Sequence, residues 1–332
     1  MHLNRRAALA IGAAALLSAP FRRAGWAAQG GGAGWSPDRP IRFVVPFPPG
    51  GATDVWARMV GDAMAAEFGQ PVVIENRSGA GGMVGTEAAA KAAPDGHTLL
   101  FTISPFIQSP VVFRRWPYQP LEDFAPIGKL GTTPLPFCIR PEISARTLAE
   151  FVAYARGKDL SFGSYAAGST GHAYAQLLSD IEKLGMTHIA YRGEAPMLTD
   201  ILGGRIQCGF HSMTAAGEYI RGGRLRALAC TGRNGIPSLP EVPTFVSLGY
   251  PATFATAGFI GLFAPALVPA EAQKRLAEVF AGVMANPAFQ RRLLDIDTIP
   301  GWLGPEAFRA EIAFQLKEWS DLATAMNLTV DG

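Results

Sequence analysis

The chain has 332 residues, of which 48% are hydrophobic, and a formal net charge of +2 at pH 7 with histidine neutral. This length allows one large domain or two domains of ordinary size, each with a substantial hydrophobic core. Four arginines lie within the first 23 residues, and subtracting these four charges from +2 leaves about −2. The remaining chain therefore offers no basic surface for nucleic acid.

The first 27 residues have the pattern of a cleavable export signal. A short basic start (residues 1–6) is followed by an alanine-rich apolar run (residues 7–19) and by small residues at 25–27. The apolar run is too short to span a bilayer and shows no amphipathic pattern. We therefore expect a periplasmic protein whose mature chain begins between about residues 24 and 34.

Two features near this signal add detail. Arg5 and Arg6 partly match a twin-arginine signal, but Ala8 stands where a bulkier apolar residue is usual, so both export routes stay open. Glycines dominate residues 30–34, and residues 28–37 are interpreted as a flexible leader that precedes the folded part of the chain.

Short apolar runs then alternate with helical patterns. The strand candidates, in chain order, are "IRFVVPF", "PVVIEN", "TLLFTI", "FAPIGKLG", "PLPFCIRP", "LSFGS", "MTHIAY", "IQCGFHS" and "LRALACTG". Helices are predicted between them, for example over 53–68 and 147–156, and the tail from 269 to 327 is expected to contain two more. This alternation is typical of parallel sheets covered by helices, and two such sets indicate two lobes.

Two glycine-rich turns each follow a predicted strand and precede a predicted helix. The first glycine turn is Pro48–Asp54 and the second is Gly163–Gly171. In open α/β sheets, ligands bind where strand ends lead into helices. A helix N-terminus offers unpaired N–H groups and the positive end of its dipole. Since neither turn contains a lysine or a cysteine, both are suited to holding an anion through backbone N–H groups.

Catalytic and nucleotide-binding motifs are incomplete. The first glycine turn lacks the Gly-Lys-Ser/Thr ending of a phosphate-binding loop, and "GAGGMVG" at 79–85 lacks the dinucleotide spacing. Ala167 replaces the first glycine of a nucleophile elbow around Ser169. The histidines show no metal-ligand spacing. We therefore expect no enzymatic activity, no metal and no cofactor.

Several single residues have competing structural interpretations. His172 is expected to support the second glycine turn and His188 to be a satisfied core residue, whereas binding and structural roles are equally weighted for His211. The carboxylate of Asp54 would repel an anion, so the stronger interpretation is an acid favoured by the dipole in the first turn of a helix. The three cysteines are expected to be buried free thiols, with one disulfide left open: Cys138, Cys208 and Cys230.

A colinear series of segments carries a family resemblance. These are "DRPIRFVVPFPPGGATD", "GQPVVIENRSGAGGMVGTEAAAKAAPDGHTLL", "WPYQPLEDFAPIG", "LSFGSYAAGSTGHAYA", "AYRGEAPMLTDILGGRI", "GGRLRALACTG" and "LPEVPTF". Together they resemble the Bug-type periplasmic solute receptors of tripartite tricarboxylate transporters, from Asp38 to the C-terminal helix. The series is far more specific than any single glycine motif.

The resemblance implies an α/β, type II periplasmic binding protein fold with two lobes and a ligand cleft between them. The first lobe is expected to comprise 38–138 and 258–332, and the second 139–257. The resemblance further implies a monomer without catalysis that binds a small organic carboxylate and meets membrane transporter subunits.

The family's ligand-binding loops carry over to matching positions in both lobes. In the first lobe they fall on Phe47, Gly50, Gly51, Ala52, Thr53, Asp54 and Ser104. In the second lobe they fall on Ser164, Gly168, Ser169, Thr170, Arg192 and Gly193. The first glycine turn is thus expected to hold the ligand carboxylate through its backbone N–H groups.

Two departures from the family pattern bear on the ligand. Phe106 stands in a stretch that is commonly small and polar, and His211 replaces a commonly acidic residue. Both changes predict a more aromatic and less acidic second end of the binding site. We therefore expect an aromatic or short-chain carboxylate without an amine, contacted by Phe106 and His211. The alternative function is a ligand sensor that presents its bound state to a membrane signalling partner, because it needs the same cleft.

Overall fold

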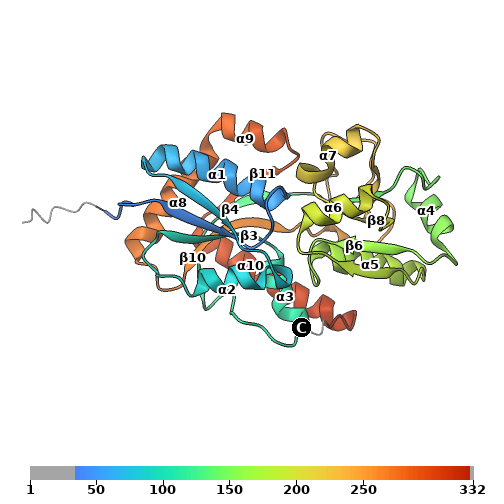
Figure 1. Ribbon diagram of the computed structural model, residues 1–332, viewed down its shortest axis with the longest axis horizontal. Helices are drawn as coiled ribbons and strands as arrows, with labels where there is room; N and C mark the ends of the chain where they lie inside the picture. Colours follow the sequence, from blue (N-terminus) through green and yellow to red (C-terminus); the bar gives the residue numbers. More distant parts are fainter. Residues whose placement is uncertain (1–33, 330–332) are drawn as a thin grey trace, which may run out of the picture. The chain divides into compact units, whose positions relative to one another are not determined.

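The computed structural model describes residues 34–329, which contain two β-sheets covered by helices (Figure 1). The first sheet has the strand order β11–β4–β10–β3–β1–β2, and the second has the order β7–β6–β8–β5–β9. We call each sheet with its helices a lobe. The predicted α/β class is confirmed. The predicted export signal lies outside the described residues, as does the leader up to residue 33.

The first lobe is built from both ends of the described chain. Its strands are β1 (Ile41–Val45), β2 (Val72–Asn76), β3 (Thr98–Ile103), β4 (Phe124–Thr132), β10 (Phe259–Pro265) and β11 (Ile299–Leu303). Its helices are α1 (Ala52–Phe68), η1 (Ala80–Gly82), α2 (Met83–Ala90), α3 (Pro105–Val112), α8 (Ala270–Ala285), α9 (Pro287–Leu294) and α10 (Pro305–Ala325). The tail therefore has three helices and a strand where two helices were predicted.

The second lobe is formed by the middle of the chain. Its strands are β5 (Pro136–Ile139), β6 (Ser161–Ser164), β7 (Thr187–Ala190), β8 (Cys208–Phe210) and β9 (Arg226–Cys230). Its helices are α4 (Leu148–Ala155), α5 (Thr170–Glu182), α6 (Glu194–Leu202) and α7 (Met213–Arg221), and η2 (Ala252–Ala255) precedes the return to β10.

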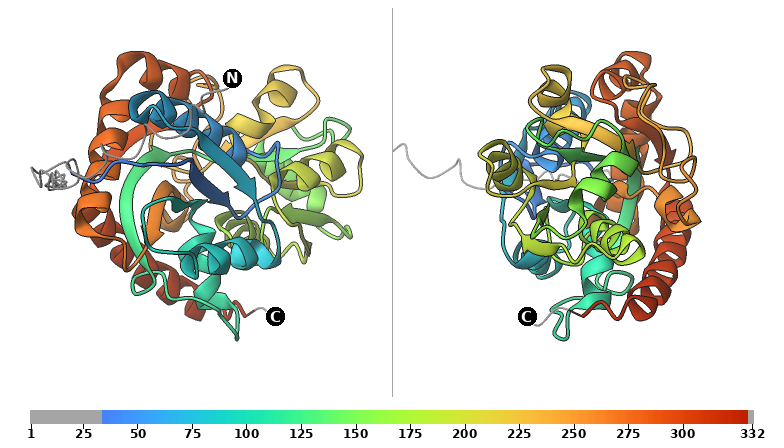
Figure 2. Two further views of the ribbon diagram at one scale, coloured as in Figure 1. Left: turned by 60° about the vertical axis from the view of Figure 1, so that its left-hand side comes forward. Right: turned by 90° about the vertical axis from the view of Figure 1, so that its right-hand side faces the viewer.

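The inner strands of the first sheet, β1, β3, β4 and β10, are mostly buried on both faces. Successive residues of a strand point to opposite sides, and in β1 Phe43 belongs to one hydrophobic cluster whereas Val44 belongs to another. The first cluster joins the sheet to α1, α8 and α9, and the second joins it to α2, α3 and α10. Figure 2 shows the long helix α10 beside β4. Burial on both faces explains why these strands are almost wholly apolar.

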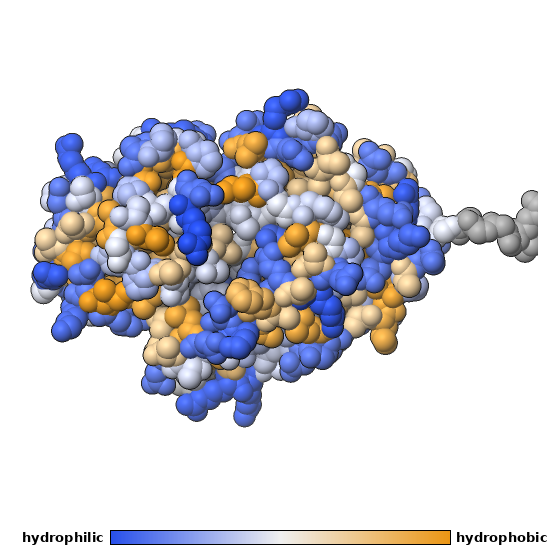
Figure 3. All heavy atoms as spheres, turned by 180° about the vertical axis from the view of Figure 1, so that it is seen from behind, coloured by the Kyte–Doolittle hydropathy of each residue, from blue (hydrophilic) through white to orange (hydrophobic). Residues whose placement is uncertain are grey.

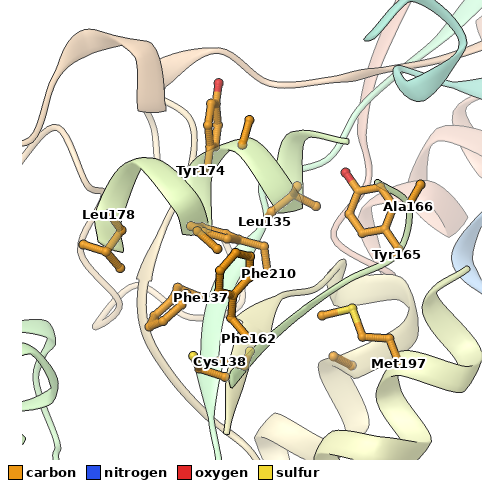
Figure 4. Close-up of a cluster of buried hydrophobic side chains, with 14 of the residues drawn as sticks. Leu135, Phe137, Cys138, Phe162, Tyr165, Ala166, Tyr174, Leu178, Met197 and Phe210 are labelled. Atoms are coloured by element: carbon orange, nitrogen blue, oxygen red, sulfur yellow. The ribbon is translucent and has the colours of Figure 1, made fainter. Parts of the chain in front are cut away.

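Aromatic residues form the core of the second lobe. The rings of Phe137 in β5 and Phe210 in β8 have centroids 5.2 Å apart, and Phe162 in β6 is fully buried in the same cluster (Figure 4). Tyr174 and Leu178 of α5 cover one side of them. The cysteines Cys138, Cys208 and Cys230 are buried and free, which confirms the favoured interpretation of the sequence.

The sheets are mixed and not purely parallel as predicted. Strands β1, β2 and β3 are parallel to one another, as are β6, β7 and β8. The exceptions are β10, which is antiparallel to β3 and β4, β11, which is antiparallel to β4, and β5, which is antiparallel to β8 and β9. Of these, β5 and β10 come directly after the crossings between the lobes.

Two boundaries differ from the prediction. Cys138 lies within β5 of the second sheet, so the first crossing falls at 133–135, a few residues before the predicted boundary. The expected flexible leader includes Trp35, which is ordered against the first lobe. Its indole N–H donates to the carbonyl of Asp95 at 3.1 Å, and its ring contacts Phe68 and His97. Because of these contacts of Trp35, the packed part of the chain begins before residue 37, where the glycine-rich composition had placed the end of the flexible leader.

On the face shown in Figure 3, hydrophobic atoms occur in small groups separated by hydrophilic ones. Of the helices that the structure describes, none is both long and apolar enough to cross a membrane.

Candidate functional site

A cavity lies where the two lobes meet. It is lined from the first lobe by Phe47, Pro48, Gly51, Ala52, Thr53, Trp56, Ile103, Ser104, Pro105, Gly258, Phe259 and Ile260. Thr133 and Leu135, at the first crossing between the lobes, and Tyr165, Thr170, Glu194 and Ser212 of the second lobe complete the lining. The volume open to the centres of water-sized spheres is about 50 Å³. The space therefore suits a compact ligand.

Five helices begin at the wall of this cavity. The starts of α1 and α3 contribute Ala52 and Pro105, and the starts of α5 and α6 contribute Thr170 and Glu194. Ser212 is the N-cap of the fifth helix, α7. Each helix N-terminus carries a partial positive charge and unpaired N–H groups. Among the described residues that line the cavity, none is lysine, arginine or histidine, so these helix ends are its source of positive potential.

Asp54 holds the first glycine turn in place from the side that faces away from the cavity. Its carboxylate accepts hydrogen bonds from the Gly50 N–H at 3.1 Å, from the Asn76 amide at 3.0 Å and from the Arg58 guanidinium at 3.0 Å. Asn76 also donates to the carbonyl of Phe47 at 3.0 Å. Burial alone would raise the pKa of Asp54, but these hydrogen bonds outweigh it and hold the pKa below its ordinary value. The carboxylate thus shapes the turn and does not line the cavity.

The second glycine turn is held by histidines, as predicted for His172. The Gly168 N–H donates to Nδ1 of His172 at 3.0 Å, and Oγ of Ser169 accepts from the His172 N–H at 3.3 Å. The ring of His172 stacks on His188 with centroids 3.7 Å apart, and Nε2 of His188 lies 2.7 Å from Oγ of Ser164. Burial lowers the pKa of His172 to about 3 and that of His188 to about 4, so both are neutral at pH 7.

A pair of hydrogen bonds joins the lobes beside the cavity. The side-chain amide of Gln108 in α3 donates to Oγ1 of Thr170 at 2.8 Å, and the Thr170 N–H donates to Oε1 of Gln108 at 3.0 Å. Gln108 and Thr170 are both almost fully buried. On the opposite side, Gly193 approaches Pro48 so closely that a Cβ there would lie 2.4 Å from Cδ of Pro48, and its φ of +138° also favours glycine. The lobes are therefore in contact around the cavity.

Glu194 is the acidic residue of the cavity, and the sequence analysis did not select it. Its side chain is 10% exposed, and its carboxylate accepts from the Ser212 N–H at 2.5 Å and from Oγ of Ser212 at 2.9 Å. Burial raises the pKa of Glu194 to about 7, against the opposing effect of the N–H and O–H groups of Ser212 and the N–H of Ala52. In the sequence, the one local indication that Glu194 belongs to the site is its position directly after Gly193, at the start of a helix.

Two residues expected to define the ligand lie elsewhere. The ring of Phe106 is 2% exposed and packs in the core of the first lobe against Tyr118, Phe124 and Phe263. It does not line the cavity because α3 turns it toward α10. His211 is fully buried, its Nδ1 lies 3.8 Å from Oε1 of Glu194, and burial lowers its pKa to about 4. It does not line the cavity either.

The structure thus divides the predicted residues into two groups. Those that line the cavity are Phe47, Gly51, Ala52, Thr53, Ser104 and Thr170. Those outside the lining are Gly50, Asp54, Phe106, Ser164, Gly168, Ser169, Arg192, Gly193 and His211. Most of the second group hold the turns in place, whereas the Arg192 side chain is exposed. Within residues 34–329, no cluster of histidine, cysteine and carboxylate side chains could hold a metal ion.

Two sheeted lobes around a cavity walled by helix N-termini define the class of periplasmic solute-binding proteins. Solved structures with this fold include periplasmic binding protein BugD, with 29% identity and a TM-score of 0.84 over 88% of this chain and 99% of that one. R. palustris Rpa4515 with adipate gives 28% identity and a TM-score of 0.85, covering 88% and 99% of the two chains. MatC of Rhodopseudomonas palustris with bound malate gives 28% identity and a TM-score of 0.79, covering 86% and 99%.

Sequence relatives define the family. Protein BugT of Bordetella pertussis is 36% identical over 288 residues, which cover 81% of this chain and 88% of that protein. The "UPF0065 protein in tcbD-tcbE intergenic region" of Pseudomonas sp. is 33% identical over 300 residues, covering 89% and 88%. Residues 56–328 match the model of the tripartite tricarboxylate transporter family receptor. The chain belongs to this family, whose members are solute-binding receptors and not enzymes.

Proposed function

We propose that this protein captures a small organic carboxylate in the cavity and presents it to the membrane subunits of a tripartite tricarboxylate-type transporter. The convergence of five helix N-termini on a cavity without a cationic side chain carries this proposal. Backbone N–H groups at helix starts recognise anions without a fixed positive charge. The structures of relatives titled with adipate and with malate support the same ligand class.

We favour a short-chain carboxylate over an aromatic one as the ligand. The expected aromatic character depended on Phe106, whose ring lies in the core of the first lobe. Adipate and malate, named in the titles of two relatives' structures, are aliphatic acids without a ring. Glu194 also removes the reason for excluding an amine, because the cavity contains an acidic side chain after all.

A thermal-shift panel tests this function. We expect short-chain carboxylates such as malate to raise the melting temperature of the purified protein, because a ligand that binds only the folded state stabilises it by mass action. The panel contains malate, adipate, benzoate and glutamate at equal concentration, with glycerol as an uncharged control. If glycerol stabilised the protein as much as the acids, or if no acid stabilised it, the proposal would be wrong.

Export is part of the same proposal. The basic and apolar pattern of residues 1–27, together with the periplasmic location named for BugD, supports cleavage and release into the periplasm. We expect the mature chain to begin between about residues 24 and 34. N-terminal sequencing of protein from the periplasmic fraction checks this; recovery of an intact Met1 there would contradict it.

A further inference from the structure

Glu194 lies across the place where a ligand carboxylate would meet the first glycine turn. Its Cβ is 3.9 Å from the position that a Cβ on Gly51 would take, and the Ala52 N–H lies near enough to its carboxylate to favour the ionised form. Ser212 holds the same carboxylate from the start of α7. A side chain of the second lobe thus lies beside a donor of the first lobe that would otherwise face the ligand alone.

Among residues 34–329, no lysine or arginine is a partner of the Glu194 carboxylate. The titratable groups that face it are His211 after β8, Tyr165 after β6 and Cys138 in β5. Burial lowers the pKa of His211 to about 4, raises that of Tyr165 to about 12 and raises that of Cys138, so all three are neutral near pH 7. Within the described chain, ionised Glu194 is therefore stabilised by neutral N–H and O–H donors and by the starts of α6 and α7, and not by a cationic side chain.

If Glu194 stays ionised, a ligand carboxylate that enters this space is strongly repelled by it. Two carboxylates that share a site raise the pKa of one of them until it keeps a proton. A protonated carboxyl group donates its O–H to the neighbouring carboxylate, and such charge-assisted hydrogen bonds are among the strong ones. The same geometry thus changes from repulsive to attractive when Glu194 gains one proton.

We propose that Glu194 contacts the ligand directly as a protonated carboxyl group, and that capture of a carboxylate takes up one proton from solvent. This inference rests on the carboxylate-binding function proposed above. The proton resides on a carboxylate oxygen of Glu194 and is shared with the ligand, and no covalent bond forms or breaks. The pKa of about 7 in the absence of ligand supports the proposal, because holding a proton near neutral pH then costs little.

Calorimetric titration with malate tests the inference. For the wild-type protein, affinity should fall by about tenfold per pH unit as the pH rises above about 7, because ionised Glu194 must first be protonated. Titrations at about pH 8.5 in two buffers of different ionisation enthalpy should show an uptake approaching one proton per malate bound. This second readout uses the wild-type protein alone and does not depend on how well a variant folds.

Glu194→Gln supplies the matched variant, because glutamine donates a hydrogen bond at every pH. We expect its affinity for malate to be independent of pH, without proton uptake, and at least about tenfold higher than wild type at about pH 8.5. Glu218→Gln, at an exposed position of α7 in the same lobe, should retain the wild-type pH profile.

Several outcomes overturn the inference. One is malate binding to the wild-type protein with constant affinity and no proton uptake. Another is an equal loss of affinity at every pH in Glu194→Gln, which indicates a structural role. A third is tight binding of glutamate with affinity that increases with pH, because this shows ionised Glu194 paired with an ammonium group. Failure of every acid in the panel at every pH is distinct, since it removes the carboxylate function and this inference with it.

Discussion

Gly51→Leu is expected to weaken ligand binding by more than about 100-fold, or about 3 kcal/mol, while the protein stays folded. Gly51 is the N-cap of α1 with φ −85° and ψ 170°, an extended conformation that any residue adopts. A Cβ at this position would have its nearest neighbours at 3.8 Å, which include the N atom of Ala195 in the other lobe. The rest of a leucine side chain must therefore enter the cavity or press against the start of α6.

Gly51→Ala is the matched control. Its single methyl group would make ordinary van der Waals contacts, so we expect its affinity to stay within about tenfold of wild type. Isothermal titration with the best acid of the panel measures binding, and urea unfolding of the ligand-free proteins checks that stability is retained. Wild-type affinity in Gly51→Leu would show that the ligand does not lie against the first glycine turn.

Much of the fold could be predicted because the apolar pattern of each segment matches the burial of its side chains in the structure. The run "IRFVVPF" is apolar throughout since both faces of β1 are covered, and it ends at the prolines that precede α1. Strand β11 was not predicted because Pro300 and Gly301 interrupt its apolar pattern. Helix α3 was also missed, because Pro105 and Pro110 lie within eight residues and argue against a helix.

The glycine turns mark most of the predicted residues that line the cavity, and the family resemblance adds Phe47 and Ser104. Gly51, Ala52 and Thr53 line the cavity because the turn that contains them leads directly into α1. Glu194 could not be placed in the same way, because its role depends on contact with Ala52 and Ser212, which are far away in the sequence. A lone acid at a helix start is usually a surface carboxylate favoured by the dipole.

The error at Phe106 has a related cause. The sequence shows that a phenylalanine follows Ser104 and Pro105 near the end of β3, but not which way the chain turns there. Helix α3 begins at this point, and its Phe106 joins the cluster beneath α10 while Pro105 faces the cavity. One step along a helix rotates a side chain by about 100°, so neighbouring residues point to different environments.

Gln108→Leu is expected to reduce ligand affinity by about 5- to 150-fold, equivalent to about 1–3 kcal/mol. Gln108 makes two hydrogen bonds with Thr170 of the other lobe, at 2.8 and 3.0 Å. Leucine has a similar size but leaves the buried N–H of Thr170 without a partner when the lobes are in contact. Periplasmic binding proteins close around ligands by hinge motion, and in an open state water can satisfy that N–H. The cost therefore falls on the closed state, to which the ligand binds.

This difference between states gives the variant a distinctive signature. We expect Gln108→Leu to unfold in urea close to the wild type when ligand-free, but to show weaker binding and, at equal ligand concentration, a larger radius of gyration in small-angle X-ray scattering. Gln176→Leu on α5 is the control, because Gln176 is half-buried and its hydrogen bond in the described chain is to Asp180 of its own helix. Equal affinities in Gln108→Leu and the wild type would mean that the bonds to Thr170 do not help to hold the lobes together around the ligand.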